Sequence, residues 1–512
     1  MKKLTLTIIT ALALCVLLIG CAEKSSTIEV GENVYTYNLG EGTLSTAAGD
    51  IPYQMQGVIG VPDAENAPVV VIIHGAHPIT TASEDRYDTG FTYLVEDLSR
   101  AGNLVLSLNV GINYSFENGE PNGNERTKQI VAQHISELKK AIDGEKTAFG
   151  LDLKSKGSLD NVVLLGHSRG GMDVFEIASE AQDFNVAGVL SIAPSYDREL
   201  SSPLPKVPIG IIIPQYDGDV VRLDGSDFYE RLLAQEGGAK DAELIYLKGA
   251  NHGAFNTQIT KKDPSTTDEI EKKLMPAEEQ RSFLSSYAAD FIQSVQASGE
   301  TPFGKAAELP TQLYGHEVLL RAHAASSKLL FSAEAPPVTA LQEVKTQQLI
   351  ASKVPDKNTV GTFNMPGSVE LNEYALTNVI WAQKGAELEI PINADLLGKA
   401  YLDFDMAMDS TDPRNAMKNQ NMSIRFIDST GAKKEITICD YAAPMQWQEG
   451  KLENLGTEGE PLYMYSTFTP LTTLRIDLKK LEGIDLSKLK TIALVFDQTD
   501  AGSIMLRSIS AS

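Results

Sequence analysis

The chain has 512 residues, of which 42% are hydrophobic and 22% are charged, and its formal net charge at pH 7 is -24. This composition is typical of folded globular proteins and excludes a largely disordered chain. Because phosphate groups would be repelled over most of so acidic a surface, we expect no nucleic-acid partner. The chain is too long for one hydrophobic core, so at least two domains are predicted.

The N-terminus has the layout of an export signal. Two lysines precede an apolar run over residues 4–19, which is short for a membrane-spanning helix. The run ends in Leu18-Ile19-Gly20-Cys21, which resembles the lipobox of bacterial lipoproteins. The resemblance implies that residues 1–20 are a signal peptide, that Cys21 is lipidated and that residues 21–30 are a tether. We therefore expect an extracytoplasmic, membrane-anchored bacterial lipoprotein; an uncleaved anchor or a plain secretory signal is the alternative.

The three cysteines fit this interpretation. Cys15 would leave with the signal peptide and Cys21 would carry the lipid. Cys439 would then be alone, so we expect no intramolecular disulfide in the mature protein. Since Cys439 ends a strand-like apolar run, we interpret it as a small buried residue.

From residue 31 to residue 300, predicted strands alternate with predicted helices. Continuous apolar runs indicate strands that are covered on both faces, and apolar residues at helical spacing indicate amphipathic helices. The predicted strands are 53–61, 69–73, 104–110, 162–165, 186–193, 209–214 and 243–247, and the predicted helices include 91–101, 125–142, 228–234 and 276–295. This alternation predicts an α/β domain with a doubly wound, mostly parallel sheet. Catalytic residues of such a domain sit at the carboxyl ends of the strands.

The pattern of predicted strands and helices changes after residue 300. Residues 301–355 mix prolines with short apolar runs, and we interpret them as a connecting region. Short strand signals separated by turn residues then recur: 386–392, 400–406, 422–427, 434–439, 472–478, 491–496 and 503–508. This spacing predicts an antiparallel, all-β sandwich over residues 356–512, an accessory domain.

A Gly-x-Ser-x-Gly motif lies between a predicted strand and a predicted helix. It runs from Gly166 to Gly170 with Ser168 at its centre. A nucleophile elbow needs this arrangement, because the serine sits on a strained turn and the glycines let neighbouring backbone pass where a Cβ would clash. Ser168 is therefore the candidate nucleophile. A simple glycine turn is the alternative, which the strand-to-helix context disfavours.

A serine hydroxyl is a poor nucleophile at neutral pH and needs an adjacent base that is held by an acid. His252 follows the predicted strand 243–247, and Asp217 follows the predicted strand 209–214. Both residues would therefore reach the same edge of the sheet as Ser168. The order serine, aspartate, histidine along the chain is the order that α/β-hydrolases use.

Residues 50–300 resemble the α/β-hydrolase superfamily, and within it the cap-poor secreted esterases of the dienelactone hydrolase, chlorophyllase and cutinase-like polyester hydrolase neighbourhood. The motifs that carry the resemblance are His74-Gly75, Gly166–Gly170, Asp217–Val220 and the loop of His252. In that superfamily the acid is usually an aspartate followed three places later by valine. The resemblance thus favours Asp217, with Asp219 as the second candidate and Asp224 as a distant third.

The resemblance also implies an oxyanion hole formed by two backbone amides. One belongs to Arg169, the residue after the nucleophile, and the other to Ala76, the residue after the His-Gly pair. His77 would replace Ala76 if the loop turned differently. The Arg169 side chain is expected only to pack or to face the solvent.

No cofactor and no metal are expected. His74 and His77 could be spaced for zinc, but no carboxylate-rich partner lies nearby in the sequence. The acidic run from Asp217 to Asp227 lacks the spacing of a calcium loop, and we expect most of it to be solvated surface. His134 and His167 are interpreted as packed structural residues.

The sequence therefore predicts a serine esterase that forms an acyl-enzyme. Only about 15 residues join the strands that end near Ala193 and begin at Ile209, which leaves no room for an inserted cap. We expect an open, lidless cleft that accepts polymeric or surface-bound esters, with residues 111–124 and 255–274 as its walls. A peptidase of the prolyl-oligopeptidase type is one alternative, although the chain lacks that family's long N-terminal propeller. A non-catalytic binding lipoprotein on the same scaffold is the other.

Overall fold

The computed structural model describes residues 25–47, 49–76, 86–114, 123–195, 203–221, 223–235, 239–334, 338–340, 344–351, 362–363, 374–410, 412–438, 445–449, 451–454, 463–467 and 470–512. The predicted signal peptide, the lipidation of Cys21, the alternative oxyanion residue His77 and the burial of Cys439 all lie outside these residues. Among the helices that are described, none has both the length and the apolar content needed to cross a bilayer.

The N-terminal part is built on an 11-stranded sheet with the order β1-β2-β3-β5-β4-β6-β7-β8-β9-β11-β10. The strands are β1 (Ser26–Gly31), β2 (Val34–Thr46), β3 (Gly49–Gly60), β4 (Ala67–Ile73), β5 (Leu104–Leu108), β6 (Gly157–His167), β7 (Val186–Ile192), β8 (Ile209–Pro214), β9 (Ala242–Leu247), β10 (Gln312–Leu313) and β11 (His316–His323). The six strands from β5 to β9 in this order run parallel. The flanking strands pair antiparallel.

Helices cover both faces of this sheet. Helices α1 (Thr92–Arg100) and α6 (Ala277–Ser298) pack on one face, and α2 (Gly123–Ile142), α3 (Arg169–Glu180) and α4 (Gly225–Ala234) pack on the other. Alternate residues of a strand point to opposite faces, so each central strand must be apolar throughout. In β4, Val69, Val71 and Ile73 face the second layer, whereas Val70 and Ile72 face the first.

The C-terminal part consists of mostly antiparallel sheets packed around their own core. Its strands are β12 (Lys328–Ser332), β13 (Thr339–Ala340), β14 (Val344–Ala351), β15 (Thr362–Phe363), β16 (Tyr374–Trp381), β17 (Ala386–Ala394), β18 (Tyr401–Met408), β19 (Ser423–Asp428), β20 (Lys433–Thr437), β21 (Lys451–Asn454), β22 (Tyr463–Thr467), β23 (Thr472–Asp477), β24 (Leu489–Phe496) and β25 (Gly502–Ala511). One sheet has the order β15-β14-β16-β25-β18-β23, with β12 also on β25, and a second has the order β13-β17-β24-β19-β20. Apolar residues of both sheets form a single buried cluster. Strands β21 and β22 pair in a separate two-stranded sheet.

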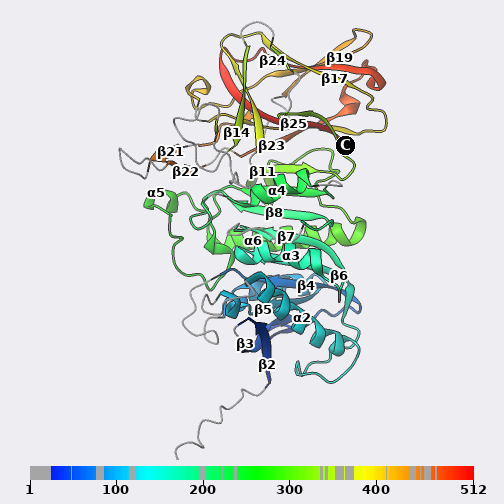
Figure 1. The fold of residues 1–512 in the computed structure, drawn as a ribbon, viewed down its shortest axis with the longest axis vertical. Coiled ribbons are helices and arrows are strands. Elements are labelled where there is room, and N and C mark those ends of the chain that lie inside the picture. The colour runs from blue at the N-terminus through cyan, green and yellow to red at the C-terminus, as the bar shows by residue number, and fades with distance from the viewer. Residues whose placement is uncertain are drawn as a thin grey trace, which may run out of the picture.

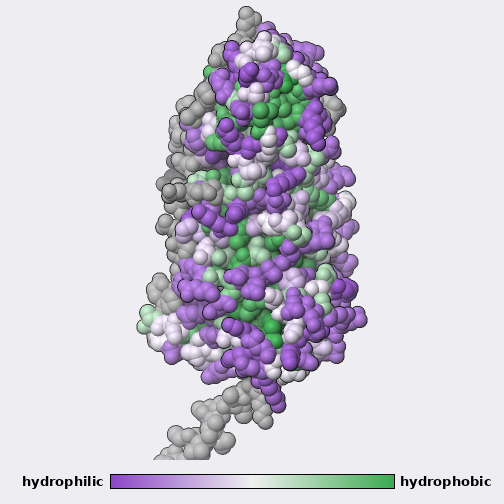
Figure 2. Space-filling view, turned by 90° about the vertical axis from the view of Figure 1, so that its right-hand side faces the viewer, coloured by the Kyte–Doolittle hydropathy of each residue, from purple (hydrophilic) through white to green (hydrophobic). Residues whose placement is uncertain are grey.

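The predicted fold class, a mostly parallel α/β sheet followed by an all-β sandwich, is confirmed by this architecture. Figure 1 shows the two parts stacked along the long axis of the molecule, with the sandwich at the top. Figure 2 shows that hydrophilic residues cover most of one face, while hydrophobic residues emerge most broadly over the sandwich.

Two segments differ from what the sequence suggested. Residues 26–30, predicted within the tether, belong to β1, the edge strand beside β2. Residues 301–355, predicted as a connecting region, are divided between the two parts: β11 extends the parallel sheet along β9, whereas β12, β13 and β14 join the sandwich. Strand β11 depends on pairing with β9, and its own sequence does not reveal this partner.

Buried ion pairs join the two parts. Arg321 on β11 is 2% exposed and places its guanidinium 2.8 Å from Glu230 Oε1 on α4 and 3.0 Å from Asp405 Oδ2 on β18. Arg507 on β25 binds the other oxygen of Glu230 at 3.1 Å. Arg475 on β23 binds Asp403 and donates to backbone carbonyls of the segment after α6. The sandwich is therefore docked on the sheet edge through charges that are largely removed from water.

We predict that Arg321→Ala lowers the stability of the whole chain. The change leaves the Asp405 carboxylate buried without its arginine and removes one of the two arginines on Glu230, a loss of about 3–5 kcal/mol. The midpoint of urea unfolding, followed by fluorescence, measures it. Arg100→Ala is the matched control, because Arg100 also pairs with two carboxylates but is 59% exposed. Arg100→Ala should lower the free energy of unfolding by less than about 1 kcal/mol. Equal decreases in the two variants would contradict the proposed contribution of the buried ion pairs to stability.

Candidate active site

The candidate nucleophile Ser168 lies where β6 turns into α3. Its backbone has φ 57° and ψ -123°, a conformation that non-glycine residues rarely adopt. The turn is held by backbone hydrogen bonds, because Ser168 N donates to Ile192 O on β7 at 2.9 Å and Ser168 O accepts from Gly171 N at 2.9 Å. The local geometry is that of a nucleophile elbow at the carboxyl end of a central strand.

The flanking glycines are required by close backbone approach. A Cβ on Gly166 would lie 2.1 Å from Gly170 O, and a Cβ on Gly170 would lie 2.4 Å from Ile73 O. Gly75 also passes close to the nucleophile, since a Cβ there would lie 2.6 Å from Ser168 Cβ. The Gly-x-Ser-x-Gly motif and the His74-Gly75 loop are far apart in the sequence, but the structure brings them into contact.

His252 and Asp217 form a buried pair. Asp217 follows β8, His252 follows β9, and the two side chains are 2% and 4% exposed. The imidazole Nδ1–H donates to Asp217 Oδ2 at 3.0 Å. The second oxygen of Asp217 accepts from the backbone N–H groups of Asp219 at 3.0 Å and Val220 at 2.6 Å. One carboxylate therefore orients the histidine ring and also closes its own loop.

The His252 backbone is held beside the elbow. Its N–H donates to Asp263 Oδ2 at 2.9 Å, and its carbonyl accepts from His167 Nε2 at 3.1 Å. The rings of His167 and His252 have their centroids 4.7 Å apart, so the candidate base lies next to the residue that precedes Ser168. Ser168 and His252 both belong to the described residues, and no direct hydrogen bond joins their side chains; instead, Asp219 Oδ2 lies 3.5 Å from His252 Nε2.

Electrostatics around His252 favour its charged form. Burial opposes a charge on the ring, but the Asp217 carboxylate, its hydrogen bond and the charges of Asp219 and Asp263 outweigh burial and raise the pKa of His252 to about 9. At His167 no carboxylate outweighs burial, which lowers the pKa well below the usual value and keeps the ring neutral. The two neighbouring histidines, whose ring planes are tilted by 42°, thus favour different charge states at neutral pH.

The candidate oxyanion loop is fixed by His74. The buried His74 ring accepts from Val110 N at 3.0 Å through Nε2, and its Nδ1–H donates to Gly75 O at 2.8 Å. Because the C=O and N–H of one trans peptide point in opposite directions, the N–H of Ala76 points away from the His74 ring. Ala76 is exposed, and Arg169, half-buried, places its guanidinium 5.6 Å from the Tyr114 ring centroid.

The structure shows residues that the sequence analysis missed or misjudged. Asp263 was not singled out, although it also accepts from Gly253 N at 3.0 Å and so clamps the start of the histidine loop. No local sequence motif identifies Asp263, because the residues that it binds lie ten and eleven positions earlier, at the other end of a folded loop. The expectation of a solvated acidic run was wrong for Asp224 and Asp227, which are fully buried at the start of α4. The side chain of Asp219 is 53% exposed.

The described residues include no group of three or more His, Cys, Asp or Glu arranged to hold a metal ion. At His74, one of the two residues considered for zinc, both ring nitrogens are already hydrogen-bonded. His134 is buried, accepts a hydrogen bond from the Tyr37 hydroxyl at 2.9 Å, and has a pKa lowered by burial to about 3. It therefore stays neutral inside the layer formed by α2.

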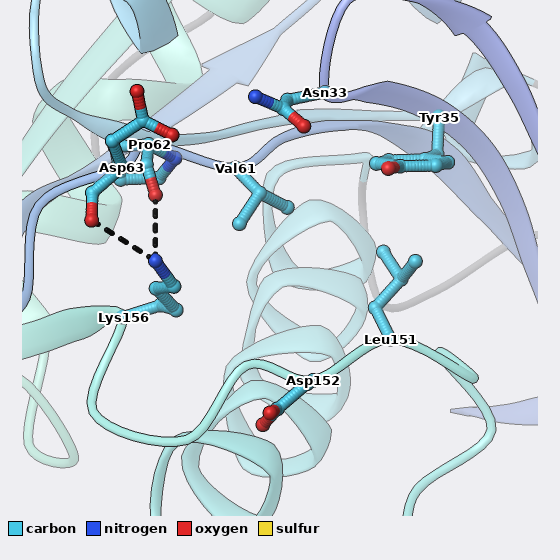
Figure 3. Close-up of a pocket in the computed structure, with 8 residues that line it drawn as sticks. All are labelled: Asn33, Tyr35, Val61, Pro62, Asp63, Leu151, Asp152 and Lys156. Carbon is cyan, nitrogen blue, oxygen red and sulfur yellow. Dashed lines mark hydrogen bonds between the residues drawn. The ribbon is translucent and has the colours of Figure 1, made fainter.

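A pocket of about 210 Å³ lies far from these residues in the fold. Figure 3 shows Lys156 on its wall with two dashed hydrogen bonds, which its ammonium donates to the carbonyls of Pro62 at 3.1 Å and Asp63 at 3.0 Å. Lys156 directly precedes β6, whereas Ser168 directly follows it. The pocket is therefore at the opposite edge of the sheet from the candidate site. The ammonium of Lys156 is already hydrogen-bonded to two backbone carbonyls.

Comparison with known proteins gives only distant similarity. Neither a family model nor a curated protein matches the sequence. Among solved structures, Est1E from Butyrivibrio proteoclasticus is similar over 51% of this chain and 100% of its own, with 13% identity and a TM-score of 0.30. A hyperthermophilic esterase from the archaeon Pyrobaculum calidifontis is similar over 50% of this chain and 86% of its own, with 18% identity and a TM-score of 0.32. These values are too low to carry an argument about activity, so the function must be argued from the geometry.

We predict that the His252 imidazole titrates well above the usual histidine range, near the value of about 9 that its surroundings favour. Asp217→Asn should lower this pKa, because it removes the nearest charge and the strongest acceptor while burial still penalises the imidazolium. NMR titration of the histidine ring measures both values, with the His134 ring as an internal control that the substitution leaves unchanged. A His252 pKa at or below 6.5 in the unmodified chain would contradict the described pair.

Proposed function

We propose that the chain is a serine hydrolase that cleaves carboxylic esters through an acyl-enzyme on Ser168. The observation that carries the proposal is the buried Asp217–His252 hydrogen bond beside a strained serine elbow. Strain at φ 57° and the burial of an ion pair both cost stability, and such costs persist where surrounding structure enforces them, most often at active sites.

The proposed reaction begins when neutral His252 takes the proton of Ser168 through Nε2 as the serine oxygen attacks the ester carbonyl carbon. Asp217 keeps the ring in the tautomer that carries hydrogen on Nδ1 and stabilises the imidazolium that forms. The amides of Ala76 and Arg169 are proposed to bind the oxyanion of the tetrahedral intermediate. Collapse breaks the ester C–O bond, and the alcohol leaves with the proton from Nε2. Water then attacks the acyl-enzyme by the same route and frees Ser168.

For the proton to move, the Ser168 hydroxyl and His252 Nε2 must come into hydrogen-bond contact. Catalytic hydrogen bonds of substrate-free enzymes are often long and tighten once substrate is bound. The tilted contact between the His167 and His252 rings places the imidazole next to the elbow, and we propose that changes in side-chain torsions close the remaining gap. Because the pKa of His252 is raised to about 9, the base form and hence kcat/KM should increase as the pH rises toward that value.

The setting of the enzyme is proposed on the sequence alone. Lipidation of Cys21 would place the domain outside the cytoplasm, at a membrane. An open cleft that admits polymeric or surface-bound esters is supported by the short crossover between β7 and β8, which spans residues 193–208.

We predict that a fluorophosphonate probe labels the chain at Ser168 and that Ser168→Ala abolishes labelling. Hydrolysis of p-nitrophenyl acetate should fall by about a thousandfold or more in the same variant, because loss of the nucleophile removes the acyl-enzyme route. Ser179→Ala on the same helix is the control, and it should be labelled like the unmodified chain. Equal labelling of the Ser168→Ala variant would remove the catalytic claim.

The substrate class needs a second measurement. A panel of p-nitrophenyl esters of increasing acyl length should be hydrolysed, and peptide p-nitroanilides should not. Preferential cleavage of the anilides would identify a peptidase with the same three residues, and absence of both activities together with absence of labelling would identify a binding protein.

A further inference from the structure

Two carboxylates flank the His252 ring, one at each nitrogen. Asp217 is buried and holds Nδ1 at 3.0 Å, whereas Asp219 places Oδ2 3.5 Å from Nε2 and has a side chain that is 53% exposed. In the proposed reaction Nε2 gives its proton to the departing alcohol. Asp219, which lies beside Nε2, therefore lies beside the alcohol part of the substrate. Because its side chain is half exposed, the alcohol part can contact it.

The position of Asp219 is set by the catalytic pair itself. Its backbone N–H donates to Asp217 Oδ1 at 3.0 Å, and the next N–H, of Val220, donates to the same oxygen at 2.6 Å. The carboxylate that orients His252 thus also holds the turn that carries Asp219. The Asp219 side chain makes no hydrogen bond of its own to other parts of the described structure, so its function is not to stabilise the loop.

The charge of Asp219 is not neutralised by a permanent cation. Across the described residues, its single ion pair is the one with His252, and that pair disappears when the ring is neutral, as the proposed base must be. Two of the four lysines in residues 255–274 are engaged elsewhere: Lys262 pairs with Asp268 and Glu271, and Lys273 pairs with Glu449. Among the described ion pairs, the other two, Lys261 and Lys272, form none with Asp219. At the start of the reaction, the alcohol side of the site therefore presents an uncompensated negative charge.

We propose that Asp219 selects substrates by the charge of the alcohol part, favouring esters of cationic alcohols over neutral ones and disfavouring esters of anionic alcohols. This inference rests on the proposed function, because it assigns a role relative to the leaving alcohol. Two unit charges about 6 Å apart in a medium of effective dielectric about 40 change an equilibrium about tenfold. The preference should weaken as ionic strength rises, since Asp219 is half exposed.

The test compares kcat/KM for three acetate esters on the full chain: a choline ester, its uncharged carbon isostere and an isethionate ester. The unmodified chain should prefer them in that order, and in the Asp219→Asn variant the ratio of the choline ester to the carbon isostere should fall about tenfold toward unity. Asp219→Glu, which keeps the charge, should retain the preference. Asp160→Asn is the control, because Asp160 is exposed at the amino end of β6 and its loss changes the net charge equally.

Ratios are the readout because Asp219 adjoins the base and its replacement also alters the overall rate. Unchanged ratios in the Asp219→Asn variant would overturn this inference and leave the esterase proposal standing. Failure of the unmodified chain to hydrolyse any of the three esters would overturn the esterase proposal and this inference with it. An equal loss of preference in the Asp160→Asn variant would assign the selectivity to the overall charge of the protein and overturn the role of Asp219.

Discussion

The steric contact between two turns of backbone at Gly166 and Gly170 is the constraint on which the candidate site depends. With 2.1 Å between a Cβ on Gly166 and the carbonyl of Gly170, only glycine lets β6 turn directly into α3. That turn forces Ser168 to a positive φ and leaves its side chain at the edge where β8 and β9 also end. Asp217 and His252, the candidate acid and base, reach the same edge because β8 and β9 run parallel to β6.

Buried ion pairs fix the position of the C-terminal sandwich on the α/β part of the chain. A sandwich joined by a solvent-exposed linker would be free to move, but here Arg321, Glu230 and Asp405 form an ion-pair chain across the boundary that is almost entirely buried. Charges removed from water are tolerated only where their partners are fixed. Glu230 lies on α4, which begins just after the loop of Asp217 and Asp219. The docking of the sandwich and the position of the acid loop are therefore held by one helix.

The sequence predicted what depends on residue patterns within a single element. Strand β8 matches the apolar run 209–214, and α2 follows the apolar stripe of Ile130, Ile135 and Leu138, because burial on one or both faces dictates those patterns. It did not predict features that arise between elements. Strand β11 exists through its pairing with β9, and Asp263 contacts His252 across a loop whose path no local motif encodes. Asp224 and Asp227 look like part of a solvated acidic run but are buried at the start of α4.

Asp217 and Asp219 illustrate why residue type alone does not assign a role. Both are aspartates in the loop after β8, both lie within hydrogen-bonding or ion-pairing distance of the His252 imidazole, and the sequence left both open as the acid. Their surroundings separate them, because Asp217 is buried with both oxygens occupied whereas Asp219 keeps half of its side chain in solvent. A buried, fully bonded carboxylate can orient a ring and stabilise its charge without exchanging partners. In the proposed reaction the serine and the leaving alcohol use the other nitrogen, so the solvated carboxylate of Asp219 must move aside there and would act on the ester through its electric field.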